Sequence, residues 1–250
     1  MLSTTFPAAA LLAASEPGFQ PFSAAHFWTV AGCVAAIAAV VAWGKKSQAT
    51  MEKKVRRGFG WFCLFVYAAY EVWLLLPKNF DWPVSLPLEF CDMGLLVAAF
   101  TLLLKTRWLR GLLYFWAFVF TLQAFATPVL HGGPDTPDFW LFWAAHTCIE
   151  GAAIYDLVVG KFRPAFEDLV RSYMISFMYA AAMLILDVFT GWDYGYVGPG
   201  KPATPTLLDA LGPFPLRVVW MVCIATAGYF IAWVPWAIAR RKRGIIGEEN

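Results

Sequence analysis

The side chains of this chain that could do chemistry stand at one end of a long apolar segment. The stretch Leu86 to Gly94 reads Leu-Pro-Leu-Glu-Phe-Cys-Asp-Met-Gly and opens an apolar run long enough to cross a bilayer. Ionisable groups are costly in hydrocarbon and mark a functional site there by default. Pro87 suits the first turn of a helix, where its missing N–H removes no hydrogen bond. We therefore expect a helix whose first turn contains Pro87 and which holds Glu89, Cys91 and Asp92 just below a membrane surface.

A second polar pair lies in a later apolar segment. His146 and Glu150 are four residues apart and so share one face of a helix. A carboxylate bonded to one imidazole nitrogen fixes the tautomer of the other, so this pair could act as a general base with its orienting group. Cys91 could supply the nucleophile, because an imidazole beside a thiol near a helix N-terminus favours the thiolate, although Asp92 opposes its ionisation. The candidate catalytic residues are therefore Cys91, His146, Glu150 and Asp92.

Each of these residues also has a structural interpretation. A cysteine in a transmembrane helix often only fills space, and the His146 and Glu150 side chains can form interhelical hydrogen bonds that hold a bundle together. Glu89 can cap the start of its own helix. The buried carboxylates also fit a non-catalytic protein that binds or transports an ion or small molecule. A metal-dependent hydrolase stays open because the three histidines fall on one side, but their spacing predicts no metal site and we expect no cofactor.

Composition places these residues in a membrane protein. The chain is 60% hydrophobic and 14% charged, whereas about 25% of the residues of a soluble domain are charged. Seven apolar runs approach the roughly 20 residues that a membrane-spanning helix needs. We predict an all-α fold in which residues 1–250 form one domain of seven transmembrane helices, at Phe27 to Trp43, Phe59 to Leu76, Leu86 to Leu104, Leu112 to Thr127, Phe139 to Val159, Tyr173 to Phe189 and Leu216 to Ile238.

The distribution of positive charge predicts the orientation. Sixteen of the 19 Lys and Arg residues fall in one alternating set of connections, and only Lys78, Lys201 and Arg217 fall in the other. The positive-inside rule makes the first set cytoplasmic. Residues 1–25 are then a short extracytoplasmic cap and residues 240–250 a cytoplasmic tail. This pattern predicts a multi-pass protein of the cell membrane, with the bacterial inner membrane as the expected location.

The same features limit the kinds of partner that the chain can have. Short basic connections beside apolar spans indicate contact with lipid headgroups rather than with nucleic acid. All five cysteines fall inside predicted spans, so they do not form a disulfide framework. We expect membrane lipids as partners, and the sequence leaves the oligomeric state open.

The embedded polar groups converge on one depth. With a rise of 1.5 Å per residue, Cys91, Gln123 and His146 lie about 6 to 10 Å inside the outer ends of their spans. We therefore expect a polar pocket that opens to the outer side. The further residues expected to bind a substrate in it are Gln123, Thr127, Asp187, Tyr194 and Lys201.

Several of these short motifs, taken together, resemble those of a known family. The chain resembles the YwaF-like bacterial integral membrane proteins, which are related to eukaryotic transmembrane protein 164, over its last five spans and their outer loops. The motifs that carry the resemblance are Leu86-Pro87-Leu88-Glu89-Phe90-Cys91-Asp92, Leu113-Tyr114-Phe115-Trp116, Thr121-Leu122-Gln123-Ala124, Thr127-Pro128, His146, Asp193-Tyr194-Gly195-Tyr196, Lys201-Pro202 and Leu207-Leu208-Asp209-Ala210-Leu211-Gly212-Pro213-Phe214-Pro215.

The resemblance implies a function. The eukaryotic relative is described as a phospholipid acyltransferase with a membrane-embedded cysteine, which maps onto Cys91, and its companion histidine maps onto His146. The chain departs from the family at Glu89, where members often carry histidine, so a role for a second histidine does not carry over. We expect an enzyme that transfers or hydrolyses an acyl group of a phospholipid in the outer half of the membrane. The alternative is a binding or transport protein that uses the buried carboxylates.

Overall fold

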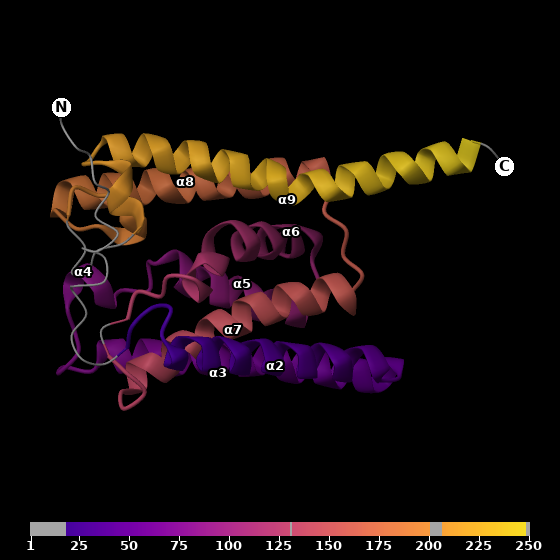
Figure 1. Cartoon of the computed structure of the whole chain (residues 1–250), viewed down its shortest axis with the longest axis horizontal. Coiled ribbons are helices and arrows are strands. Elements are labelled where there is room, and N and C mark those ends of the chain that lie inside the picture. Colours follow the sequence, from indigo (N-terminus) through magenta and orange to yellow (C-terminus); the bar gives the residue numbers. More distant parts are fainter. Residues whose placement is uncertain (1–18, 131, 201–206, 249–250) are drawn as a thin grey trace.

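The regular structure of the chain is helical wherever it is described. The computed structural model describes residues 19–130, 132–200 and 207–248, and within these ranges it contains no strand. The long helices run side by side along one axis (Figure 1). They are α2 (Ala24–Lys46), α3 (Ala49–Leu75), α5 (Phe90–Leu104), α6 (Arg107–Trp116), α7 (Pro137–Val158), α8 (Phe166–Thr190) and α9 (Leu216–Glu248), with a short α4 (Trp82–Ser85) and the single turns η1 (Ala117–Thr121), η2 (Leu122–Phe125), η3 (Tyr194–Tyr196) and η4 (Leu207–Leu211).

Six helical segments in the described ranges are long and apolar enough to cross a membrane. They are Ala24–Lys46, Ala49–Leu75, Trp82–Leu104, Arg107–Phe125, Phe166–Thr190 and Leu216–Arg241. The 22-residue helix α7 is not among them, since Glu150, Asp156 and His146 make it more polar. The chain is thus an all-helical, multi-pass membrane protein. The predicted span that is absent from this set, Phe139 to Val159, corresponds to α7, which has the length but not the apolar composition.

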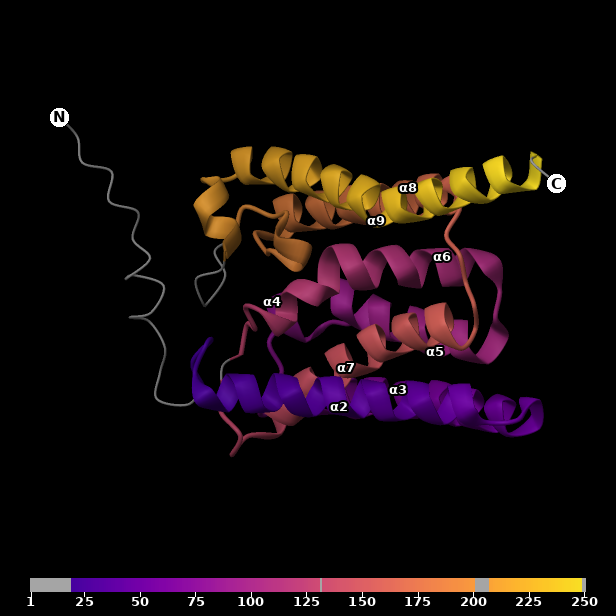
Figure 2. The same cartoon turned by 45° about the vertical axis from the view of Figure 1, so that its right-hand side comes forward.

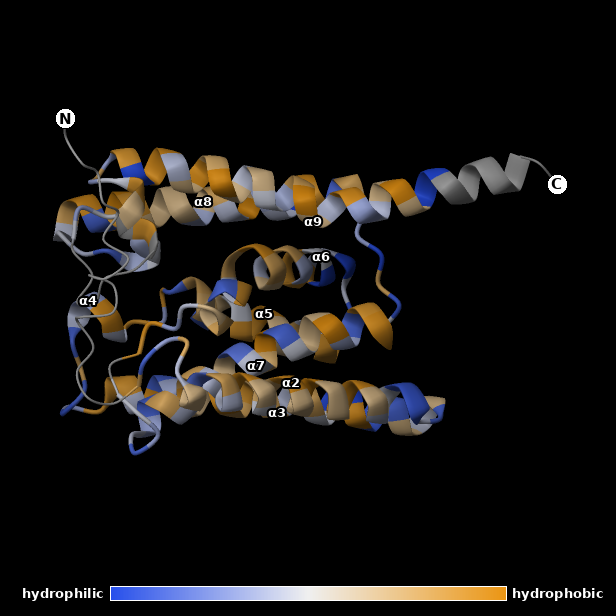
Figure 3. Ribbon diagram, in the orientation of Figure 1, coloured by the Kyte–Doolittle hydropathy of each residue, from blue (hydrophilic) through white to orange (hydrophobic). Residues whose placement is uncertain are grey.

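Helix α7 can be polar because other helices enclose it. In Figures 1 and 2 the α2–α3 pair lies on one side of a middle layer formed by α5, α6 and α7, and the α8–α9 pair lies on the other side. More than half of the residues of α7 are buried, including His146, Glu150 and Asp156. The lipid-facing helices α2, α8 and α9 bury few residues. In Figure 3 hydrophobic residues predominate along the middle of these helices, and many hydrophilic residues lie at the helix ends and connections.

Small residues let the middle helices approach closely. The largest buried cluster joins α3, α5 and α7 through residues such as Cys63, Ala98, Ala99, Cys148 and Ala152. Small side chains at helix interfaces in a membrane allow the tight van der Waals packing that holds such bundles together.

Gly44 gives a direct test of this packing. A Cβ added at Gly44 would meet the ring of Tyr155 at 2.5 Å, because the end of α2 rests on that side chain. We expect Gly44→Ala to destabilise the chain by about 1 to 3 kcal/mol through overpacking, measured by unfolding in detergent. Gly32→Ala is the matched control, since a Cβ there meets nothing within 4 Å. Equal stability of the two variants would contradict the described α2–α7 contact.

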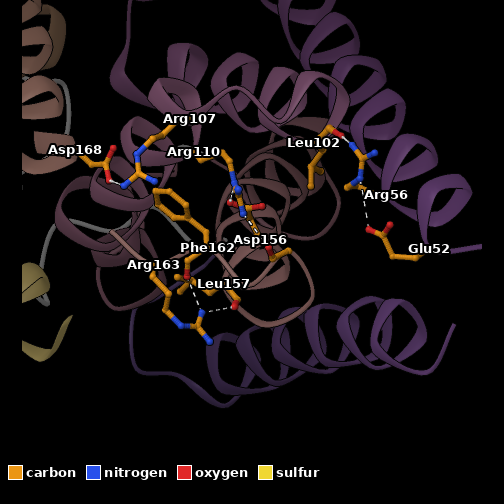
Figure 4. Close-up of polar contacts among 11 residues, drawn as sticks. Glu52, Arg56, Leu102, Arg107, Arg110, Asp156, Leu157, Phe162, Arg163 and Asp168 are labelled. Atoms are coloured by element: carbon orange, nitrogen blue, oxygen red, sulfur yellow. Dashed lines mark hydrogen bonds and ion pairs between the residues drawn. The ribbon is translucent and has the colours of Figure 1, made fainter. Parts of the chain in front are cut away.

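Ion pairs tie the helices together at the basic end of the bundle. Figure 4 shows Arg107 with Asp168 and Arg110 with Asp156, at nitrogen to oxygen distances of 2.6 and 2.7 Å. The first pair joins α6 to α8 and the second joins α6 to α7. Asp156 of α7 therefore lies at this basic end of the bundle. Part of the positive charge at this end stabilises the fold and is not available for an external partner.

Candidate functional site

The helix that carries Cys91 begins later than the sequence suggested. Pro87 lies in a turn between α4 and α5, not in the first helical turn, so that prediction was wrong. Glu89 is the N-cap residue, and its backbone N–H donates to the Asp92 carboxylate at 3.0 Å. A carboxylate three residues past the cap satisfies an otherwise unpaired amide at the helix start, which is why the helix begins at Phe90. Cys91 is therefore the second residue of α5.

Cys91 and His146 line the same cavity. It has a volume of about 460 Å³ and lies between the middle helices and the α8–α9 pair. Most of its wall is apolar, from side chains of α8 and α9 such as Phe177, Leu184 and Met221. Its polar members include Glu89, Cys91, Thr121, Gln123, Thr127, His146 and Ser176. Of the predicted site residues, the structure thus places Cys91, Gln123, Thr127 and His146 in the lining of one cavity.

The orienting partner of His146 is a backbone carbonyl. His146 is 4% exposed, and its Nδ1 lies 2.9 Å from the Phe142 carbonyl oxygen. A carbonyl can only accept, so Nδ1 carries the proton and Nε2 of the neutral ring keeps its lone pair. Glu150 instead accepts a hydrogen bond from the Thr121 hydroxyl at 2.8 Å. The hydrogen bond predicted between His146 and Glu150 is not formed among the described residues, because the imidazole reaches the carbonyl one turn back on its own helix.

The chain leaves regular α-helix beside this cavity. Helix α6 ends at Trp116 and continues as the π-helical turn η1 and the 3₁₀ turn η2, where the sequence predicted one uninterrupted span. Such irregular turns are frequent at functional sites. They carry Thr121 and Gln123, and Thr127 follows directly after them. Sequence reasoning missed Thr121 and this interruption, since no Gly or Pro within residues 117–125 signals it.

Tyr194 lies in the loop between α8 and α9. Its side chain is 0% exposed, its hydroxyl donates to the Trp82 carbonyl at 2.6 Å, and it accepts from the Leu86 N–H at 3.1 Å. Burial raises the pKa of Tyr194 to about 12, so the phenol stays protonated. Tyr194 thus fastens both ends of α4 to the loop, while its neighbour Tyr196 lines the cavity.

The remaining predicted binding residues lie away from the cavity wall or outside the described residues. Asp187 is 0% exposed and packs beneath Gly198, where an added Cβ would meet the Asp187 Cβ at 2.6 Å. The backbone N–H of Tyr194 approaches the Asp187 carboxylate without a hydrogen bond of normal geometry. Lys201 lies outside the described residues.

Sequence reasoning also missed Arg217, which organises the loop between α8 and α9. Arg217 stands in the first turn of α9 and is 6% exposed. Its Nη2 donates to the Asp193 carboxylate at 2.7 Å and to the Gly198 carbonyl at 2.7 Å. Asp193 in turn accepts from the Gly198 N–H at 2.8 Å. The available signal was that Arg217 is one of only three basic residues on the side predicted to be outer.

The donor groups of the site do not form a recognisable metal cluster. Within residues 19–130, 132–200 and 207–248, no group of three or more His, Cys, Asp and Glu side chains is placed to hold an ion. Both ring nitrogens of His26 face backbone groups, of Phe22 and Phe125. His131 lies outside the described residues.

Comparison with known proteins gives one relationship. No curated protein and no solved structure matches the chain. The model of the TMEM164 family matches residues 21–233, which include α2 to α8, the first half of α9 and both walls of the cavity. The protein therefore belongs to the TMEM164 family.

Proposed function

We propose that this protein is an integral membrane enzyme that transfers or hydrolyses an acyl group of a phospholipid through Cys91. The observation that supports it best is the position of Cys91 and His146 on one largely apolar cavity between helices. A thiol can act as a nucleophile and an imidazole as its general base. An apolar cavity bordered by lipid-exposed helices suits an acyl chain. Membership of the TMEM164 family and the resemblance of Cys91 and His146 to the reactive residues of its eukaryotic relative agree with this proposal.

The proposed reaction has two acyl transfers. His146 Nε2 takes the proton of the Cys91 thiol as the sulfur attacks the ester carbonyl carbon of the lipid. The tetrahedral intermediate collapses with cleavage of the ester C–O bond, and the departing alcohol receives the proton from His146. The acyl group then remains on Cys91 as a thioester. A hydroxyl acceptor or water attacks the thioester carbonyl carbon and His146 takes its proton. The C–S bond then breaks, the acyl group leaves on the new oxygen, and the proton on His146 returns to the released sulfur to restore the thiol.

The other predicted residues take supporting roles in this proposal. Gln123 and Thr127 line the cavity and can donate hydrogen bonds to the oxyanion or to the lipid phosphate. Glu150 acts through Thr121, and Asp92 acts through the cap that sets the position of Cys91. Asp187 and Tyr194 hold the outer loop over the cavity. Lys201, on the same loop in sequence, is proposed to contact the headgroup.

We further propose that α7 is a seventh span, shielded from lipid by its neighbours, so that the N-terminus is outside and the C-terminus is cytoplasmic. Sixteen basic residues then face the cytoplasm, as the positive-inside rule requires. The proposed location is the bacterial inner membrane, in the YwaF-like branch of the family. Cysteine accessibility at single introduced sites on each side of the membrane tests the orientation.

The experiment that tests the function uses the purified chain in lipid nanodiscs with a phospholipid that carries a labelled acyl chain. Appearance of the label in free fatty acid or in an acylated lysolipid supports the proposal. A wild-type chain that forms neither product while Asp92→Asn and Asp187→Asn abolish uptake of an ion or small molecule supports transport instead and contradicts the proposal.

The role of Glu150 can be tested with the same assay. The Glu150 oxygen that is not bonded to Thr121 is buried without a partner, and the carboxylate forms no hydrogen bond with His146 in the described structure. We expect Glu150→Gln to lower kcat by less than about tenfold, because the Phe142 carbonyl still orients the imidazole. A loss in the range of about 10²- to 10⁴-fold, as expected for removal of the general base itself, would contradict this assignment.

A further inference from the structure

A second and larger hollow lies on the opposite side of α7 from the proposed active site. Helices α2 and α3 form its walls and α7 forms its floor, and its volume is about 900 Å³. It shares no lining residue with the cavity that holds Cys91. We call it the α2–α3 groove. Its lining residues are Trp28, Thr29, Gly32, Cys33, Ala36, Ile37, Val40, Trp43, Met51, Lys54, Val55, Gly58, Phe59, Phe62, Trp140, Trp143, Ala144, Thr147 and Cys148.

Small residues between large aromatic residues create the groove. Gly32 and Gly58 face open space, since a Cβ built on either would meet nothing within 4 Å. Trp28 and Trp43 stand 15 residues apart on α2, which is about 22 Å along a helix. The groove therefore extends over much of the roughly 30 Å of hydrocarbon in a bilayer and suits an extended acyl chain.

The basic end of the groove carries uncompensated positive charge. Lys54 lines the groove there and forms no ion pair with the described residues. Further basic residues at the same end of α2 and α3 are Lys45, Lys46, Lys53 and Arg57. The one acidic residue between Lys45 and Arg57 is Glu52, which is already engaged by Arg56 at 3.5 Å and by the Tyr155 hydroxyl at 3.3 Å. A ligand with an apolar tail and a negatively charged head complements this arrangement.

We infer that the α2–α3 groove binds one anionic phospholipid of the leaflet at the basic end, with its phosphate at Lys54 and an acyl chain along Gly32 and Gly58. A phospholipid is favoured over a second copy of the chain by the charge at Lys54, because another copy presents the same positive connection there. This binding site is separate from catalysis and does not depend on the reaction proposed for Cys91.

Native mass spectrometry of the purified full chain tests this site, with phosphatidylglycerol as the anionic probe and phosphatidylcholine as the zwitterionic probe. We expect the wild-type chain to retain phosphatidylglycerol in preference. Lys54→Gln should lower that preference about fivefold, the worth of one lysine at an anionic headgroup. Lys53→Gln is the matched control, since Lys53 is exposed on the same turn and does not line the groove, and it should change the preference less than about twofold.

Filling the groove gives an independent arm of the test. The double variant Gly32→Leu and Gly58→Leu should reduce retention of both lipids at least about tenfold, whereas Ala35→Leu, on the exposed face of α2 outside the groove, should not. Equal retention of the two lipids by the wild type, or equal effects of Lys53→Gln and Lys54→Gln, would overturn the inference. A lipid-free wild-type dimer that the filled groove converts to a monomer would also overturn it, in favour of a second copy. If the double variant does not fold, the lysine pair still decides the outcome.

Discussion

Cys91→Ala is expected to lower acyl turnover on purified phospholipid by at least about 10³-fold, because the nucleophile of a covalent mechanism is removed. Cys148→Ala is a suitable control, since Cys148 is buried and lies in the other hollow. The two variants should unfold at similar denaturant concentrations, which separates loss of chemistry from loss of fold. Full turnover by the Cys91→Ala chain would exclude a covalent role for this residue.

The same experiment extended to His146 tests whether the two residues act as one unit. General acid–base catalysis contributes about 10²- to 10⁴-fold, so His146→Ala should cost that much alone. In the double variant the losses should not multiply, because a base has no function without its nucleophile. Multiplicative losses would indicate that Cys91 and His146 contribute separately, and the proposed proton transfer between them would be wrong.

Arg217→Met is expected to give the largest loss of stability among the residues that hold the loop between α8 and α9, about 3 to 5 kcal/mol. It removes two hydrogen bonds of 2.7 Å and leaves the largely buried Asp193 carboxylate without its cation. The free energy of unfolding in mixed micelles measures the effect. Because this loop contacts α4 and the residues just before α5, turnover should fall together with stability.

A double-mutant cycle distinguishes this ion pair from a general effect of the substitution. If Arg217 acts mainly by neutralising Asp193, then adding Asp193→Asn to Arg217→Met should recover part of the lost stability, since no unpaired charge remains buried. Additive destabilisation in the double variant would show that the two side chains act independently.

Much of the fold followed from hydropathy and charge alone. Apolar runs near the length of the bilayer predicted six segments that the structure also contains as long apolar helices. The boundaries were less accurate at α5, because the sequence pattern suggested Pro87 as a first-turn residue while the Asp92 cap sets the start at Phe90. Helix α7 was predicted from length, but its polar residues reflect enclosure by other helices, which hydropathy does not report.

Part of the candidate site could be predicted from the depth of its residues along their helices. Depth along each helix placed Cys91, Gln123 and His146 at a similar level, and the structure brings them to one cavity. Depth gives no direction around a helix axis, however, so it did not separate Asp187, which packs beneath Gly198 of the loop, from residues of the cavity wall. The partner of His146 was missed because its own helix backbone, rather than a side chain, accepts the bond.

The most direct measurement of the central claim is the mass of the acyl-enzyme itself. The purified chain is mixed with a phospholipid that carries one labelled acyl chain, quenched in acid and digested, and the peptide that contains Cys91 is analysed by mass spectrometry. The proposal predicts one added acyl group on Cys91 that hydroxylamine removes, with no adduct in Cys91→Ala and much slower formation in His146→Ala. Turnover of the lipid with no acyl adduct on Cys91 at any time would contradict it.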